Sequence, residues 1–157
     1  MTQAIARDRG NLPAIVVTKR DFGKLNNVIG DYAPIISWDA VRFLLGELAR
    51  ARVVDNEHIP PTNVTMGSQV EIRERHTGET RLATLTYPAE QRLYRDAVSV
   101  LTPLGAALLG LPKEQSINYI DSDGKEMTVE VLKILHQPEA QQRFKRTSRV
   151  DPSSNTR

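Results

Sequence analysis

The sequence contains no cysteine, few aromatic residues (5%) and no long apolar run. Without cysteine the chain forms neither a disulfide nor a thiolate metal site, as is common for proteins of a reducing cytoplasm. No segment approaches the roughly 18 consecutive apolar residues of a membrane span. Residues 1–10 lack the apolar centre of a secretory signal. We therefore expect a cytoplasmic protein that makes no contact with a membrane.

Strong charge of one sign is missing from the middle of the chain. The formal net charge is only +2 at pH 7. Residues 62–138 carry eight basic and ten acidic side chains, whereas residues 139–157 carry five basic and two acidic ones. A near-neutral body argues against a DNA-binding domain. The basic residues of 139–157 are candidates for contact with nucleic acid or an acidic surface, the alternative being a solvated, disordered tail.

The first third of the chain predicts a pair of helices. Residues 1–13 are polar, lack periodicity and are expected to form a mobile arm. Residues 14–54 hold two amphipathic patterns, one capped by Thr18 and ending near Gly30, the next capped by Ser37. The short loop between them predicts an antiparallel, coiled-coil-like helical hairpin. Its arms should be only about 17 and 22 Å long at the rise of an α-helix.

The remaining pattern predicts a small sheet. Residues 55–63 contain two consecutive prolines and form a linker, because proline cannot continue a helix. Residues 64–138 then show the two-residue alternation of half-buried strands, interrupted by one short helical segment. The fold class is therefore α+β, with a helical hairpin followed by an antiparallel sheet that carries one short helix. The strands are expected near 70–73, 81–87, 97–101, 116–120 and 126–135.

The most distinctive stretch is a strand-to-helix corner within residues 99–111. Thr102 can accept a hydrogen bond from a free backbone N–H group, and Pro103 suits the first position of a helix. Gly110 supplies the left-handed residue that closes the helix after about two turns. Compact corners of this kind are usually structural, so their composition alone assigns no function.

Patterns for catalysis and metal binding are missing. The three histidines, His58, His76 and His136, lie in a linker, a turn and a strand end, without the spacing of metal ligands. There is no glycine-rich phosphate loop and no nucleophile elbow. Asp121 and Asp123 fit a hairpin turn, because the residues after them do not continue a calcium-binding loop. We therefore expect no catalytic residue, no metal and no cofactor.

Asp31 and Tyr32 are the candidate functional residues at the tip of the helical hairpin. A carboxylate in an exposed loop could hold a divalent cation for another enzyme, but a single carboxylate binds Mg²⁺ weakly. Asp39, the nearby acid, falls in the first turn of the second helix, where it meets the helix dipole favourably. A structural or solvated role is therefore favoured for Asp31. Trp38 is expected to pack in the core of the hairpin.

Four segments follow one another along the chain: Val-Thr-Met-Gly-Ser at 64–68, Thr-Tyr-Pro-Ala at 86–89, the corner at 103–110 and Gln-Pro-Glu-Ala at 137–140. In this order they resemble the Gre-factor superfamily of bacterial transcription factors. Within that superfamily the likeness is greatest to the group of regulators of nucleoside diphosphate kinase, and it spans residues 14–138. The resemblance implies that 64–138 adopt the FKBP-like fold of the superfamily and dock on RNA polymerase near its secondary channel.

The resemblance places the polymerase contact at the corner, on Leu101, Thr102, Pro103, Leu104 and Gly105. In the cleavage factors of the superfamily this corner carries an acidic-Ser-Pro pattern. Here Pro103 matches, Thr102 is a mild replacement, and Leu101 stands where the acid would be. The departure weakens a charge-based contact and leaves a small apolar patch for a partner helix.

The cleavage factors also extend a long coiled coil with an acidic tip toward the polymerase active centre. The predicted arms here are short and carry only Asp31 at the tip. The resemblance therefore implies a non-enzymatic regulator that competes with or modulates Gre-type factors. An alternative is an effect, direct or indirect, on the level or activity of nucleoside diphosphate kinase.

A third possibility, a peptidyl-prolyl isomerase, rests on the fold alone. Its cleft would need a cage of aromatic side chains, and the sheet domain offers only Tyr87, Tyr94 and Tyr119.

We favour a monomer, because the apolar stripes of the two predicted helices can cover each other.

Overall fold

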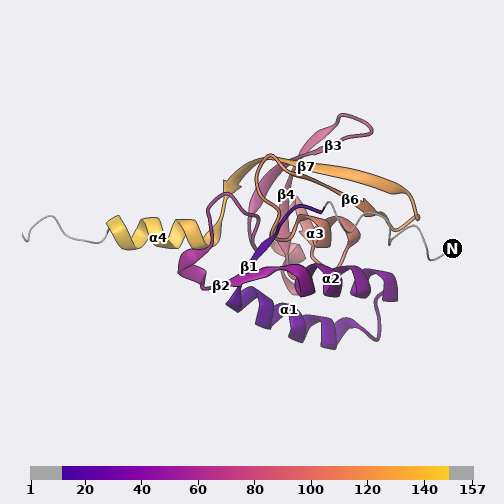
Figure 1. The fold of residues 1–157 in the computed structure, drawn as a ribbon, viewed down its shortest axis with the longest axis horizontal. Coiled ribbons are helices and arrows are strands. Elements are labelled where there is room, and N and C mark those ends of the chain that lie inside the picture. Colours follow the sequence, from indigo (N-terminus) through magenta and orange to yellow (C-terminus); the bar gives the residue numbers. More distant parts are fainter. Residues whose placement is uncertain (1–11, 149–157) are drawn as a thin grey trace, which may run out of the picture.

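A five-stranded sheet forms the centre of the molecule (Figure 1), for which a computed structural model describes residues 12–148. The strand order is β5-β4-β3-β7-β6, and β3 pairs antiparallel with both β4 and β7, as does β6 with β7. The strands are β3 (Gln69–Glu74), β4 (Thr80–Thr86), β5 (Ala97–Ser99), β6 (Ser116–Ile120) and β7 (Glu126–His136).

The sequence predicted an antiparallel sheet, but one pair of strands is parallel. Strand β5 pairs parallel with β4, with Thr84 opposite Ala97 and Thr86 opposite Ser99. The polar connection after β4, which includes the 3-10 turn η3 (Pro88–Leu93), is long enough to return the chain to the starting end of β4. The prediction failed because alternation within a strand does not report the direction of its neighbour.

Two short strands flank the helical pair. Strands β1 (Val16–Thr18) and β2 (Arg52–Val54) pair in parallel and stand before α1 (Lys19–Tyr32) and after α2 (Trp38–Arg50). Sequence analysis did not predict either strand, because three residues are too few to show alternation.

The predicted helix starts are confirmed. The hydroxyl of Thr18 accepts a hydrogen bond from the backbone N–H of Asp21 at 3.1 Å, and that of Ser37 from Ala40 at 3.3 Å. The end of α1 lies beyond the predicted Gly30, because the ladder of hydrogen bonds runs on until Ala33 donates to Ile29. With 14 and 13 residues, the helices are about 21 and 20 Å long.

The helical pair and the sheet share one hydrophobic cluster. Leu25 of α1 and Leu44 of α2 are fully buried in the same cluster as Val70 and Leu85 of the sheet. Helix α2 packs on α3 (Pro103–Leu108), which in turn packs on the sheet (Figure 1). The expected place of Trp38 in this core is wrong, because its side chain is 65% exposed. The buried stripe of α2 starts one turn later, at Val41, Leu44 and Leu48.

The prediction that the whole segment 139–157 is disordered is wrong, because its first part is helical. Helix α4 covers Pro138–Ser148. The guanidinium of Arg143 donates to the backbone carbonyls of Asn56 at 3.2 Å and of Ile59 at 3.0 Å, which lie in the predicted linker. These contacts hold the helix against the 3-10 turn η2 (Asn56–His58).

The outer parts of the predicted arm and tail, residues 1–11 and 149–157, lie outside the described residues. Among residues 12–148, no helix is both long and apolar enough to cross a bilayer.

Candidate functional site at the strand-to-helix corner

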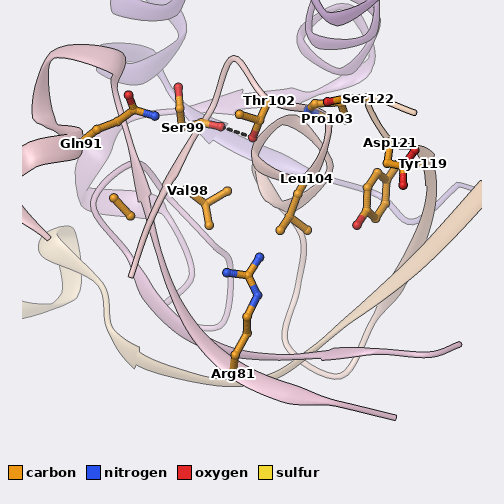
Figure 2. Close-up of a pocket in the computed structure, with 11 residues that line it drawn as sticks. Arg81, Gln91, Val98, Ser99, Thr102, Pro103, Leu104, Tyr119, Asp121 and Ser122 are labelled. Atoms are coloured by element: carbon orange, nitrogen blue, oxygen red, sulfur yellow. Dashed lines mark hydrogen bonds between the residues drawn. The ribbon is translucent and has the colours of Figure 1, made fainter. Parts of the chain in front are cut away.

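The corner between β5 and α3 is fixed by its own side chains. The hydroxyl of Thr102 donates to the carbonyl oxygen of Ser99 at 2.6 Å (Figure 2) and accepts from the backbone N–H of Gly105 at 3.1 Å. Pro103 is the first residue of the helix, and Gly110 follows it with φ +73°. The predicted cap and helix stop are thereby confirmed.

Gly105 allows α3 to lie directly on the end of β5. A Cβ atom added to Gly105 would overlap the carbonyl oxygen of Ser99. Gly105 is itself buried, so its part in the corner is to permit this close packing. Close packing in turn presents Thr102, Pro103 and Leu104 at the surface beside the strand.

A hollow of about 320 Å³ lies against this corner (Figure 2). Three of the five predicted docking residues, Thr102, Pro103 and Leu104, line it, whereas Leu101 and the buried Gly105 do not. The other walls come from segments far away in the sequence: Arg81 of β4, Gln91 of η3, Ala97, Val98 and Ser99 of β5, Tyr119 of β6, and Asp121 and Ser122 of the following turn.

Both polar and apolar side chains line the hollow. Its charged groups are Arg81 and Asp121. One oxygen of Asp121 accepts hydrogen bonds from the backbone N–H groups of Asp123 and Lys125, both at 2.9 Å, which agrees with the interpretation as a hairpin turn. Burial raises the pKa of the Tyr119 hydroxyl, and Arg81 opposes that effect. Among residues 12–148, no three His, Asp or Glu side chains gather in a way that would hold a metal ion.

Asp31 and Tyr32 lie away from this hollow, in the last turn of α1 and not in the loop where they were expected. Asp31 is exposed and Tyr32 is half-buried. Ile35 of the adjoining loop is 77% exposed, and Trp38, the first residue of α2, is exposed as well. The end of the helical pair is therefore apolar as well as acidic. The sequence did not indicate this, because Trp38 was assigned to the core and Ile35 to a loop without a role.

A second polar cluster, also missed, lies inside the molecule. The Asp21 carboxylate accepts from the backbone N–H of Met66 at 3.3 Å and from the Tyr87 hydroxyl at 3.2 Å. Glu139, at the start of α4, accepts from the Thr65 hydroxyl at 2.7 Å. This cluster joins the start of α1 and the start of α4 to the segments that flank the sheet.

The cluster holds an acid with a perturbed pKa. Burial, followed by the nearby Glu139 carboxylate, raises the pKa of Asp21 to about 6, although its hydrogen bonds act in the opposite direction. Burial and the Asp21 charge also raise the pKa of Tyr87. The Lys24 ammonium lies 4.6 Å from the centroid of the Tyr87 ring. Only the placement of an acid three residues after the Thr18 cap gave a sequence signal for this cluster.

The α+β fold agrees with comparisons to known proteins. Residues 59–136 match the family described as "Transcription elongation factor, GreA/GreB, C-term". The chain belongs to this GreA/GreB family of transcription factors.

Among individual proteins, the chain is 36% identical over 130 residues to the "Regulator of nucleoside diphosphate kinase" of Escherichia coli (strain K12). That match covers 82% of this chain and 93% of the relative. The chain is also 29% identical over 99 residues to the "Transcription elongation factor GreA" of Solidesulfovibrio magneticus, covering 62% of this chain and 60% of that protein.

A solved structure shows the same fold. The "Prokaryotic transcription elongation factor GreA/GreB from Nitrosomonas europaea" superposes with a TM-score of 0.61 at 34% identity. The match covers 79% of this chain and 99% of that one. The relatives are thus regulators and transcription factors by name, in agreement with the resemblance found in the sequence.

Proposed function

We propose that this protein is a non-enzymatic regulator of transcription that binds RNA polymerase near its secondary channel and competes with or modulates Gre-type factors. The observation that carries the proposal is the hollow at the corner, where Thr102, Pro103 and Leu104 are presented together. Family membership supplies the partner, because the related proteins are transcription elongation factors. Leu101 lies beside the hollow, half-buried, and Gly105 holds the corner in shape.

In this proposal the helical pair of residues 14–54 is a short counterpart of the Gre hairpin, and 64–138 form the FKBP-like docking domain, joined by 55–63. Helices of about 20 Å are short for reaching into a deep channel. Asp31 at their end is a single carboxylate, and metal sites that act in catalysis combine several oxygen ligands. Binding without delivery of a catalytic metal would make the protein a competitor, with Asp31 and Tyr32 acting by occupying space.

The experiment is a fluorescence titration of the labelled full chain with core RNA polymerase, with and without an excess of GreA. The proposal expects saturable binding that GreA displaces. Leu104→Ser should weaken binding about tenfold, as expected for loss of an apolar contact inside an interface. The matched control is Leu93→Ser, because Leu93 is 71% exposed and does not line the hollow. Absence of binding at low salt would contradict the proposal.

A second candidate function is regulation of nucleoside diphosphate kinase, which the printed name of the Escherichia coli relative favours. Activity of the purified kinase with and without an excess of this protein tests a direct effect. A change in activity would support this candidate, and unchanged activity would leave only an indirect route through transcription.

The proposal also covers the partners. We take the protein to act as a monomer and propose the basic C-terminal segment as a nucleic-acid contact. The exposed Lys145 of α4 supports this proposal, as does Arg146, which also pairs with Glu57 at 3.4 Å. Light scattering and oligonucleotide binding test these two statements separately.

A further inference from the structure

Arg81 occupies a position where the pattern of β4 calls for an apolar side chain. The strand places Ala83 and Leu85 in the core, and both are fully buried. Because side chains alternate along a strand, Arg81 belongs to the same row and faces the same side of the sheet. Its partner across the ladder is Ile72 of β3, which is also buried. The core-facing row of β4 therefore ends in a cation.

The Arg81 side chain lines the hollow at the corner. Strand β5 covers β4 only along Thr84–Thr86, so the neighbouring strand does not screen Arg81. Figure 2 shows the Arg81 guanidinium directed toward Leu104 and Val98 across the hollow. The positive charge thus lies opposite the corner that is proposed to meet the polymerase.

Arg81 forms no ion pair within the described residues. Arg73 and Arg75 of the same sheet region approach Glu130 within 3.9 and 3.8 Å, whereas Arg81 has no carboxylate within 4.0 Å among residues 12–148. Asp121 lines the hollow too, but one of its oxygens is engaged by two backbone N–H groups of its own turn. Within the described residues, the Arg81 guanidinium is therefore available to donate hydrogen bonds to a carboxylate of a partner.

The geometry points to Arg81 as a specificity-determining residue, and we propose that it pairs with an acidic side chain of the polymerase segment that docks against Leu104. This inference rests on the proposed function and adds the charge of the partner to it. A guanidinium binds a carboxylate through two parallel hydrogen bonds, and apolar walls such as Val98 and Leu104 strengthen the pair by excluding water.

The shape of the hollow favours a protein side chain as its occupant, because the hollow is open to solvent and encloses little space. Sites for small molecules enclose roughly 300–1,000 Å³. The hollow, at about 320 Å³, lies at the lower limit of that range and is shaped by an exposed strand end and a helix corner. The space suits one or two side chains of a docked segment, one of them acidic.

The test compares binding of core RNA polymerase by the full chain and its variants Arg81→Gln, Arg81→Glu and Arg81→Lys. The matched control is Arg73→Gln, because Arg73 lies on the neighbouring strand and falls on the opposite face, one residue from the buried Ile72. Titrations at several salt concentrations separate a charge pair from an apolar contact, since salt screens only the former. Thermal unfolding of each variant checks that the fold is retained.

The inference expects Arg81→Gln to weaken binding about tenfold and Arg81→Glu more strongly, because like charges repel across an interface. Arg81→Lys should keep part of the affinity, Arg73→Gln should match the parent, and Arg81→Gln should show a weaker salt dependence than the parent. Equal affinity of the parent and Arg81→Glu overturns the inference and leaves the proposed function intact. It would assign Arg81 to protecting the open edge of β4. Failure of the parent chain to bind overturns both.

Discussion

Replacing Asp21 by asparagine should make the protein more stable at neutral pH. The Asp21 carboxylate is buried with Glu139 nearby, and its pKa is raised to about 6 from an ordinary value of 3.8. An asparagine keeps an oxygen that can accept from the Met66 N–H and gains an amide N–H that can donate to the Tyr87 hydroxyl. Asp21→Asn therefore removes the buried charge while it retains the hydrogen bonds.

The magnitude follows from the difference between the two pKa values. At about 1.4 kcal/mol per pH unit, a change from 3.8 to about 6 corresponds to roughly 3 kcal/mol. The folded state binds the proton more tightly than the unfolded state. The stabilisation from Asp21 is therefore complete below pH 3.8 and is lost as the pH rises through about 6.

The assay is urea unfolding of the parent and of Asp21→Asn at pH values from 4 to 8. The difference between their free energies of unfolding cancels the other titrating groups, including Asp55, whose pKa is lowered by Lys19. That difference should change in favour of the variant by about 2.5 kcal/mol between pH 4 and pH 7.5, because at pH 4 the unfolded chain is already largely ionised at Asp21. Glu139→Gln should reproduce part of the effect, because the Glu139 charge also raises the pKa of Asp21.

A pH-independent difference between the parent and Asp21→Asn would refute this reasoning. It would mean that Asp21 keeps an ordinary pKa in the folded protein. A variant that is less stable at pH 7.5 than at pH 4, relative to the parent, would show that the carboxylate is stabilising when ionised, and the sign would be wrong.

Three further predictions concern packing. Gly105→Ala should lower the free energy of unfolding by about 3 kcal/mol, measured in urea, because its Cβ would overlap the carbonyl oxygen of Ser99. Trp38→Ser should change the stability by less than about 0.5 kcal/mol, since Trp38 is largely exposed. Arg143→Ala should accelerate amide hydrogen exchange in α4 about tenfold and leave the sheet unchanged, because Arg143 holds that helix to backbone carbonyls.

The features that the sequence predicted well depend on neighbours within one turn. Thr18 and Thr102 each accept from an N–H group three residues further along, and Gly110 adopts the positive φ that ends α3. These arrangements recur wherever the local residues allow them. The corner with Pro103 and Leu104 was therefore visible in the sequence before its position in the fold was known.

The features that were missed depend on residues far apart in the chain. Helix α4 is held by Arg143 through carbonyl groups 84 to 87 residues away. The environment of Asp21 comes from Met66 and Tyr87, which are 45 and 66 residues away. The exposed position of Trp38 likewise follows from where the other elements end. Periodicity and capping rules carry no information about such distances.

The candidate site shows both kinds of feature. Its corner was predicted from adjacent residues, whereas its walls come from Arg81, Gln91 and the turn at Asp121. One signal for Arg81 was present in the sequence, because it continues the alternating row of Ala83 and Leu85 with a charge. A charge at the end of a core-facing row becomes informative only when the structure shows that the row opens into a hollow.

The measurement that tests the central claim most directly is binding of the labelled full chain to core RNA polymerase in the presence of increasing GreA. The account predicts saturable binding that GreA displaces completely, and displacement at lower GreA concentration for Leu104→Ser than for Leu93→Ser. Binding that GreA does not displace, or no binding at low salt, would contradict it.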